Sequence, residues 1–164
     1  MRILSPAVPR AVIDDEIGAA RYPGHSPARW ALPLVAALDD EARGWQRVAL
    51  APDEFAALWL PPHAGEPCHG DTMALGTTTD GGTLATLGDW LDAHADAYAA
   101  ANPSCWGRIE AARQEPPSCL VVAGWSVGDR VKPDHAALVV VDGLHRALGA
   151  WRRGDRTCEA YLPR

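Results

Sequence analysis

The sequence contains very little lysine, since Lys132 is the only one among its 164 residues. In total, 15 basic residues stand against 21 acidic ones, which gives a formal net charge of −6. Nucleic-acid binding depends largely on Lys and Arg side chains that neutralise phosphates, so this balance argues against a nucleic-acid partner. A small anionic ligand needs only a few donors at one site and remains compatible with the composition.

Long apolar runs are also missing from the sequence. No stretch approaches the roughly 20 apolar residues that a membrane-spanning helix needs. The first six residues lack the apolar core of a signal peptide. We therefore expect a cytoplasmic protein without a membrane partner, and a length of 164 residues is enough for one domain with a real core.

The four cysteines, Cys68, Cys105, Cys119 and Cys158, form no C-x-x-C pair. This spacing indicates neither a zinc knuckle nor a redox pair, and reduced, buried thiols are expected in a cytosolic protein. We accordingly predict no metal ligands. The irregular segment 61–71 contains His63, Glu66, His69 and Asp71. It is interpreted as a solvated loop, as the wall of an active site, or as a contact for a metal ion or a Mg-phosphate, with His63 and His69 as the possible metal ligands.

Hydrophobic periodicity predicts an α+β fold with a small mixed sheet and flanking helices. Residues 1 to about 30, which are rich in Pro, Ala and Arg, are expected to form a partly ordered arm. Strands are predicted at 45–50, 119–123, 136–141 and 158–162. Helices are predicted at 32–43, 84–101, 105–114 and from 144 to about 153. A hairpin turn is expected around Gly128-Asp129.

The most informative segment is Asp142-Gly143-Leu144-His145-Arg146. It follows a Val-rich run that is typical of a buried strand, and it precedes apolar residues at helical spacing. Gly154 then stands where a helix C-cap glycine is expected. A glycine at a strand-to-helix turn lets an anion approach the free N–H groups of the helix start, and an arginine can bind that anion with two hydrogen bonds.

This turn, with the strand before it and the helix after it, resembles the ParB/sulfiredoxin-like fold. The resemblance implies a ParB/sulfiredoxin-like domain over 44–164 with an N-terminal extension over 1–43. Members of this superfamily include chromosome-partition CTPases, sulfiredoxin and free-serine kinases, and the kinases carry D-G-H-H-R at this turn. Leu144 replaces the first histidine here. It also stands where sulfiredoxin has its cysteine, so sulfiredoxin chemistry is not expected.

The resemblance to the free-serine kinases implies a nucleotide-dependent phosphotransferase, with ATP or ADP and Mg²⁺ as cofactors. Gly143, Leu144 and His145 would supply backbone N–H groups to the phosphate. Arg146 would pair with the phosphate, and His145 would donate to it or take part in proton transfer.

Two carboxylates complete the implied catalytic set. Glu66 would orient the hydroxyl of a small acceptor such as an amino acid. Asp142 would hold the turn or contact a water molecule of Mg²⁺. Two alternatives remain open from the residues alone: a non-catalytic module that binds a nucleotide or phosphate, and an enzyme of different small-molecule chemistry on the same scaffold.

Overall fold

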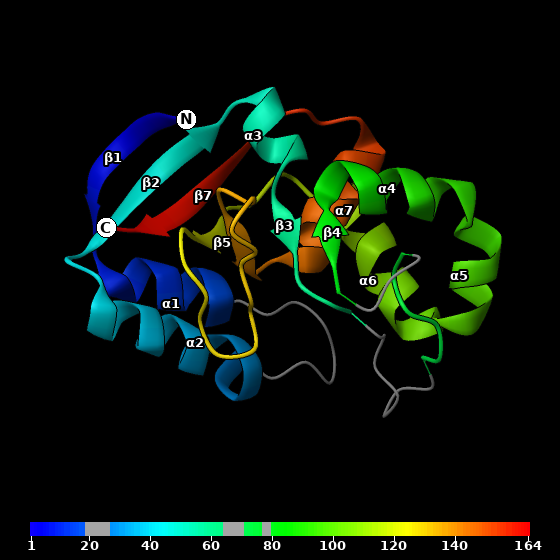
Figure 1. The fold of residues 1–164 in the computed structure, drawn as a ribbon, viewed down its shortest axis with the longest axis horizontal. Coiled ribbons are helices and arrows are strands. Elements are labelled where there is room, and N and C mark those ends of the chain that lie inside the picture. Colours follow the sequence, from blue (N-terminus) through cyan, green and yellow to red (C-terminus); the bar gives the residue numbers. More distant parts are fainter. Residues whose placement is uncertain (19–26, 64–70, 77–79) are drawn as a thin grey trace.

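A computed structural model describes residues 1–18, 27–63, 71–76 and 80–164. Within these residues, seven strands form one mixed sheet with the order β1-β2-β7-β5-β6-β3-β4 (Figure 1). The α+β class with a mixed sheet and flanking helices is therefore confirmed. Among the described helices, none has both the length and the apolar character needed to cross a membrane.

The helices and strands follow one another along the chain as β1 (Arg2–Val8), α1 (Arg10–Gly18), α2 (Pro27–Glu41), β2 (Trp45–Leu50), α3 (Pro52–Ala56), β3 (Trp59–Leu60), β4 (Gly82–Thr83), α4 (Leu84–Ala93), α5 (Ala95–Ala101), α6 (Pro103–Gln114), β5 (Leu120–Ala123), β6 (Val139–Asp142), α7 (Leu144–Arg153) and β7 (Cys158–Pro163).

The central strands β5 and β6 are buried on both faces of the sheet. Val122 and Val140 belong to the core that the sheet forms with α3 to α7. Val121, Val139 and Val141 belong to a second core, which the sheet forms with α1 and α2. Successive side chains of a strand point to opposite faces, so a strand covered on both sides must be apolar at every position. This explains the uninterrupted apolar runs in the sequence.

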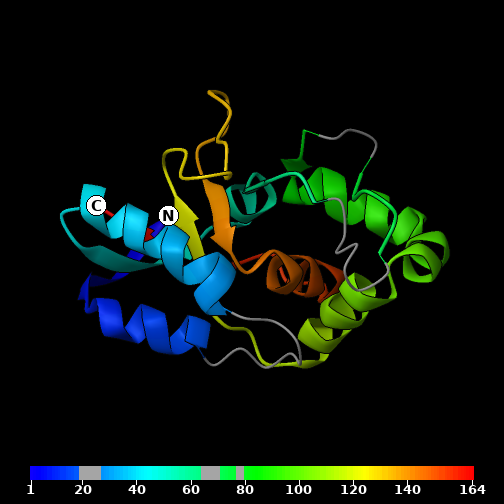
Figure 2. The same ribbon diagram turned by 90° about the horizontal axis from the view of Figure 1, so that it is seen from below.

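The N-terminal segment adds one strand to the edge of the sheet and a layer of two helices to one of its faces. Strand β1 pairs antiparallel with β2 and so extends the same sheet. Helices α1 and α2 lie side by side under that half of the sheet, where Ile13, Val35 and Leu38 are fully buried (Figure 2). The expectation of a partly ordered arm is therefore wrong for residues 2–18, because this segment has a strand partner and a buried apolar face.

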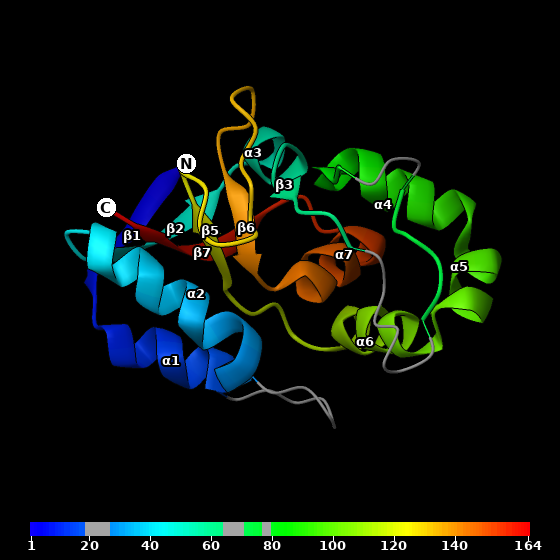
Figure 3. The same cartoon turned by 60° about the horizontal axis from the view of Figure 1, so that its bottom comes forward.

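Helices α6 and α7 pack closely against each other (Figure 3). Cys105 at the start of α6 lies beside His145 at the start of α7. Near their ends, a Cβ placed on Gly149 would come within 2.8 Å of the backbone nitrogen of Arg113. The contact thus requires a residue without a side chain in α7, and it brings the N-terminal ends of the two helices together.

Most of the predicted elements are present. The strands predicted at 45–50, 119–123, 136–141 and 158–162 correspond to β2, β5, β6 and β7. The bridge between Val127 and Arg130 confirms the expected hairpin turn. The helix predicted over 84–101 is divided at His94 into α4 and α5. The two-residue strands β3 and β4 were not expected, because such short segments carry no periodicity.

The close approach of α6 and α7 yields a stability prediction. Gly149→Ala should lower the free energy of unfolding by about 1 to 3 kcal/mol, because the new methyl group meets the backbone of α6. Gly107→Ala is the matched control in α6, where a Cβ meets nothing within 4 Å. It should raise stability by about 0.5 to 1 kcal/mol. Urea denaturation of both variants measures the two effects, and equal stabilisation would contradict the tight contact.

Candidate functional site

Three chemically reactive side chains from distant parts of the chain meet at one point. The Nε2 atom of His63 lies 3.2 Å from the Sγ atom of Cys105. The Nε2 atom of His145 lies 3.3 Å from the same sulfur. The two imidazole rings meet edge to face with their centroids 5.2 Å apart. Cys105 is fully buried and the two histidines are half-buried. We call these three residues the His–Cys–His cluster.

The topology of the sheet explains why the two histidines meet. Strands β3 and β6 are parallel neighbours, with Trp59 opposite Val139. The residues that follow parallel strands emerge at the same edge of a sheet. His63 comes three residues after β3, and His145 comes three residues after β6. Both histidines are therefore delivered to one edge, where the packing of α6 on α7 adds Cys105.

The backbone of Cys105 is held by a buried carboxylate. Asp71 is only 1 % exposed, and its two oxygens accept hydrogen bonds from the backbone N–H groups of Ser104 (3.0 Å) and Cys105 (3.1 Å). These N–H groups belong to the first turn of α6, where a helix has no carbonyl partners of its own. Asp71 thus caps α6 from a distant loop and fixes the position of the thiol.

A second buried polar side chain, Asn102, forms hydrogen bonds with the residues that follow Asp71 in the same loop. The side-chain oxygen of Asn102 accepts hydrogen bonds from the backbone N–H groups of Thr72 and Met73, both at 2.8 Å. Its amide nitrogen donates to the carbonyl oxygen of Met73, also at 2.8 Å. Asn102 is fully buried, so the strength of these bonds is little reduced by water. The loop and the start of α6 therefore form one rigid unit beside the cluster.

A tyrosine completes the surroundings of the sulfur. The hydroxyl of Tyr98 lies 3.2 Å from the Sγ atom of Cys105, and the tyrosine is fully buried. Burial raises the pKa of Tyr98 well above its ordinary value. The hydroxyl therefore keeps its proton at neutral pH. It can accept a hydrogen bond from a Cys105 thiol, and it would donate one to the sulfur if a metal ion held it as a thiolate.

Two other cysteines have environments of a different kind. Burial is the main cause that raises the pKa of the Cys119 thiol, and it raises the pKa of the Cys158 thiol to about 12. Both side chains therefore remain neutral thiols at physiological pH. They behave as packing residues, in line with the expectation of reduced, buried thiols.

Arg146 points away from the His–Cys–His cluster. Its guanidinium donates to the Asp142 carboxylate (2.5 Å), to the carbonyl oxygen of Cys119 (2.7 Å) and to the hydroxyl of Ser118 (3.2 Å). The Glu16 carboxylate lies 3.8 Å away. Arg146 therefore joins the turn after β6 to the start of β5 and to α1, and two carboxylates already balance its charge.

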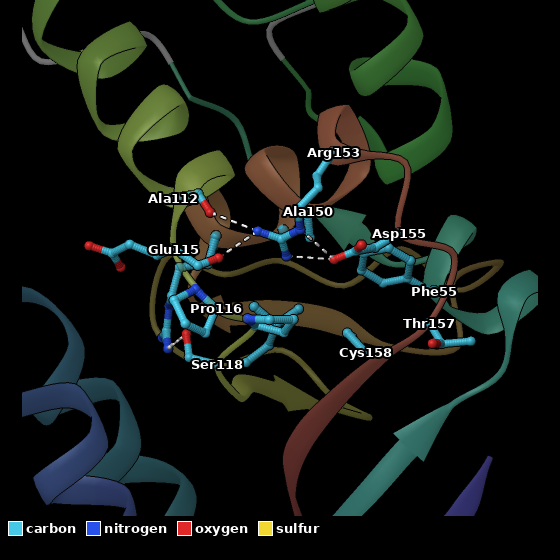
Figure 4. A pocket seen from close by; sticks show the side chains of 14 residues that line it. Phe55, Ala112, Glu115, Pro116, Ser118, Ala150, Arg153, Asp155, Thr157 and Cys158 are labelled. Atoms are coloured by element: carbon cyan, nitrogen blue, oxygen red, sulfur yellow. Dashed lines mark hydrogen bonds and ion pairs between the residues drawn. The ribbon is translucent and has the colours of Figure 1, made fainter.

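A small pocket opens on the Arg146 side of α7 (Figure 4). Arg153 reaches into it, donating to the carbonyl oxygens of Glu115 (2.7 Å) and Ala112 (3.2 Å) and to the carboxylate of Asp155 (2.5 Å). Positive charge at these carbonyls stabilises the C-terminal end of α6. Of the described residues that line this pocket, none belongs to the His–Cys–His cluster.

The other residues singled out by the sequence lie at the turn or outside the described residues. Gly143 ends β6 with φ of +99°, the left-handed conformation that favours glycine. Leu144 is half-buried and packs against the core. Glu66 falls within 64–70, which lies outside the described residues. Of the predicted catalytic residues, His145 alone is brought into the cluster by the described structure.

Sequence reasoning did not single out Cys105 or Tyr98, whereas His63 and Asp71 belong to the 61–71 segment that it interprets as a solvated loop or as part of a site. The segment Asn102-Pro103-Ser104-Cys105 does contain a signal, because Pro103 marks a helix start and places Cys105 in the first turn. Helix N-termini lower the pKa of cysteine thiols in general, so a cysteine at this position deserved separate consideration.

Together these residues define an α+β protein with a buried thiol between two imidazoles, a set that suits either nucleophilic chemistry or metal binding. The chain belongs to a family of unknown function, DUF6309, which matches residues 33–162. The match includes all three members of the His–Cys–His cluster and begins after β1 and α1. No curated protein and no solved structure matches the chain.

The capping role of Asp71 can be tested by its removal. Asp71→Ala should lower the free energy of unfolding by about 1 to 3 kcal/mol, because it leaves two N–H groups of α6 without their acceptor. Asp40→Ala, at an exposed position near the C-terminal end of α2, is the control and should change stability by less than about 0.5 kcal/mol. Thermal unfolding of both variants checks this, and equal effects would contradict the capping role.

Proposed function

We propose that the chain carries a ParB/sulfiredoxin-like domain and acts as a nucleotide-dependent phosphotransferase on a small hydroxyl-bearing metabolite such as an amino acid. The order of elements supports the domain assignment. A strand with a helical turn (β2 and α3) is followed by the two short strands β3 and β4, by helices, by β5, by a hairpin connection to β6 and by α7 and β7. This is the order that the resemblance at the Asp142–Arg146 turn implies.

The turn between β6 and α7 carries the proposal. Gly143 leaves the strand in a left-handed conformation, and α7 begins at the next residue. The N–H groups of the first helical turn have no carbonyl partner within the helix, and they carry the positive end of the helix dipole. A phosphate fits such a place, because it accepts these hydrogen bonds and complements the charge.

The residues at the turn fit a nucleotide phosphate better than they fit a direct arginine clamp. A Cβ on Gly143 would come within 2.7 Å of Leu120 and 3.1 Å of the Arg146 guanidinium, so only glycine fits where the strand turns into the helix. Arg146 acts in this proposal as a positioning residue. Its bond to Asp142 fixes the turn whose N–H groups hold the phosphate of ATP or ADP.

Phosphoryl transfer depends mainly on positioning and on positive charge at the phosphate oxygens. His145 follows the phosphate-binding turn and would donate a hydrogen bond or move a proton. Asp142 would hold the turn, and Mg²⁺ would neutralise phosphate charge when bound with the nucleotide. Glu66 would orient the acceptor hydroxyl, which receives the phosphoryl group as its proton leaves.

A charge at the first position of α7 tests the phosphate site. Leu144→Asp puts a carboxylate where the phosphate would bind, whereas Leu144→Asn removes the same apolar contacts without the charge. A nucleotide at about 100 times its Kd should stabilise the wild type by about 2.7 kcal/mol, a Tm shift of about 5 to 10 °C. We expect this shift to persist in Leu144→Asn and to vanish in Leu144→Asp. The measurement is thermal unfolding with ATP, ADP, CTP, GTP or pyrophosphate, with and without Mg²⁺.

No shift with any of these ligands in the wild type would overturn the proposal. Equal shifts in the two Leu144 variants would place the phosphate elsewhere. Phosphorus NMR with candidate acceptors then separates an enzyme from a binding module, because a module would bind the nucleotide and leave it intact.

A further inference from the structure

We propose that His63, Cys105 and His145 bind one divalent transition-metal ion, zinc by the chemistry of the ligands, through Nε2, Sγ and Nε2. The three ligand atoms lie within 4.8 Å of one another. Imidazole nitrogen and thiolate sulfur are the ligands that zinc takes in proteins. This inference uses His145, which the proposed function also assigns to the phosphate site, but it rests on the geometry of the three side chains and its test needs no nucleotide.

The spacing of the ligand atoms agrees with a tetrahedral site. Zinc bonds of about 2.3 Å to sulfur and 2.0 to 2.1 Å to nitrogen place those ligand atoms roughly 3.5 Å apart. The two nitrogen-to-sulfur distances are 3.2 and 3.3 Å. A shift of a few tenths of an ångström would therefore admit the ion, and both histidines already aim the same kind of nitrogen at the sulfur.

Burial favours a ligand over a nucleophile at Cys105. A nucleophilic sulfur must be reached by its substrate, and this side chain is 0 % exposed. A catalytic cysteine also needs one imidazole as its base, whereas here two imidazoles face the same sulfur. An ion can enter past the half-buried rings of His63 and His145, and it makes use of all three side chains.

The surroundings of Cys105 suit a metal-bound thiolate. The sulfur lies in the first turn of α6, beside a residue of the first turn of α7, where helix N-termini carry partial positive charge. The buried hydroxyl of Tyr98 lies 3.2 Å from the sulfur and would donate to a metal-bound thiolate. A thiol at Cys105 would lose its proton when the ion binds, so that an S–H bond is exchanged for a metal–sulfur bond.

Among the residues that the structure describes, these three side chains are the group that could hold the ion. The cluster lies at the sheet edge beside the first turn of α7. An ion held there would add positive charge near the turn that the proposed function assigns to a phosphate.

The metal site can be tested on the full chain without any nucleotide. After treatment with a chelator, the wild type is titrated with Zn²⁺ against a chromophoric chelator and, separately, with Co²⁺ by absorption spectroscopy. We expect one equivalent of either ion to bind, with a sulfur-to-cobalt charge-transfer band in the near ultraviolet. Cys105→Ser should abolish this band, and His63→Gln should weaken binding by more than about 100-fold, the upper range for losing a supporting partner.

Two matched variants serve as controls. Cys158→Ser removes a neutral thiol on β7, and His135→Ala removes an exposed histidine that packs against Trp59. Both should bind the ions as the wild type does. If the wild type binds neither ion, or if Cys105→Ser and His63→Gln bind them undiminished, the proposal is overturned. Because Cys105→Ser can fail to fold, the half-buried His63 provides the second, independent test.

Tyr98 provides a test of the thiolate itself. Tyr98→Phe removes the hydroxyl that donates to the sulfur, so the thiolate becomes more electron-rich and the cobalt charge-transfer band should move to lower energy. Zinc affinity should fall by about 10-fold, the lower range for an outer-shell partner. Tyr161→Phe, a buried tyrosine of β7, is the control and should leave the band and the affinity unchanged. An unchanged band in Tyr98→Phe would show that Tyr98 only packs against the cluster.

Discussion

The close packing of α6 on α7 is the contact on which the candidate site depends. Gly149 allows the two backbones to approach, and Arg153 binds the carbonyl oxygens at the end of α6, which fixes the position of one helix on the other. With these contacts in place, the side chains of Cys105 and His145 meet near the starts of the two helices. The chemistry of the cluster thus follows from a contact that contains no reactive group.

Helix α7 directs the side chains of the Asp142–Arg146 turn to two different parts of the protein. His145 and Arg146 are consecutive in α7, so their side chains leave the helix about 100° apart. One reaches the His–Cys–His cluster, and the other is held by Asp142 and by the start of β5. Because buried carboxylate and carbonyl partners are costly to leave unpaired, Arg146 is more suited to brace the turn than to follow a ligand.

The sequence predicted most of the central sheet and α7, because burial on both faces makes β5 and β6 uniformly apolar and gives α7 a single apolar stripe. It did not predict the cluster, whose members are separated by 42 and 40 residues and follow no local motif. Only the parallel pairing of β3 with β6 joins His63 to His145, and β3 has two residues. For Asp71 the sequence left open a solvated loop or a role in a site, and it could not predict the capping of α6, because the partners of Asp71 on that helix are tertiary.

His145 links the two proposals and limits how they combine. Its Nε2 nitrogen has one lone pair, so this atom cannot hold a metal ion and carry a proton for a phosphate at the same time. With an ion bound, proton transfer would fall to another group, and His145 would act through charge. A divalent ion bound to one thiolate leaves a net charge of about +1 at the N-terminal ends of α6 and α7, where both helix dipoles are already positive. That positive charge favours an anionic ligand at the turn after β6, so a bound metal ion would strengthen phosphate binding there. The same ion would prevent His145 from donating a proton during phosphoryl transfer.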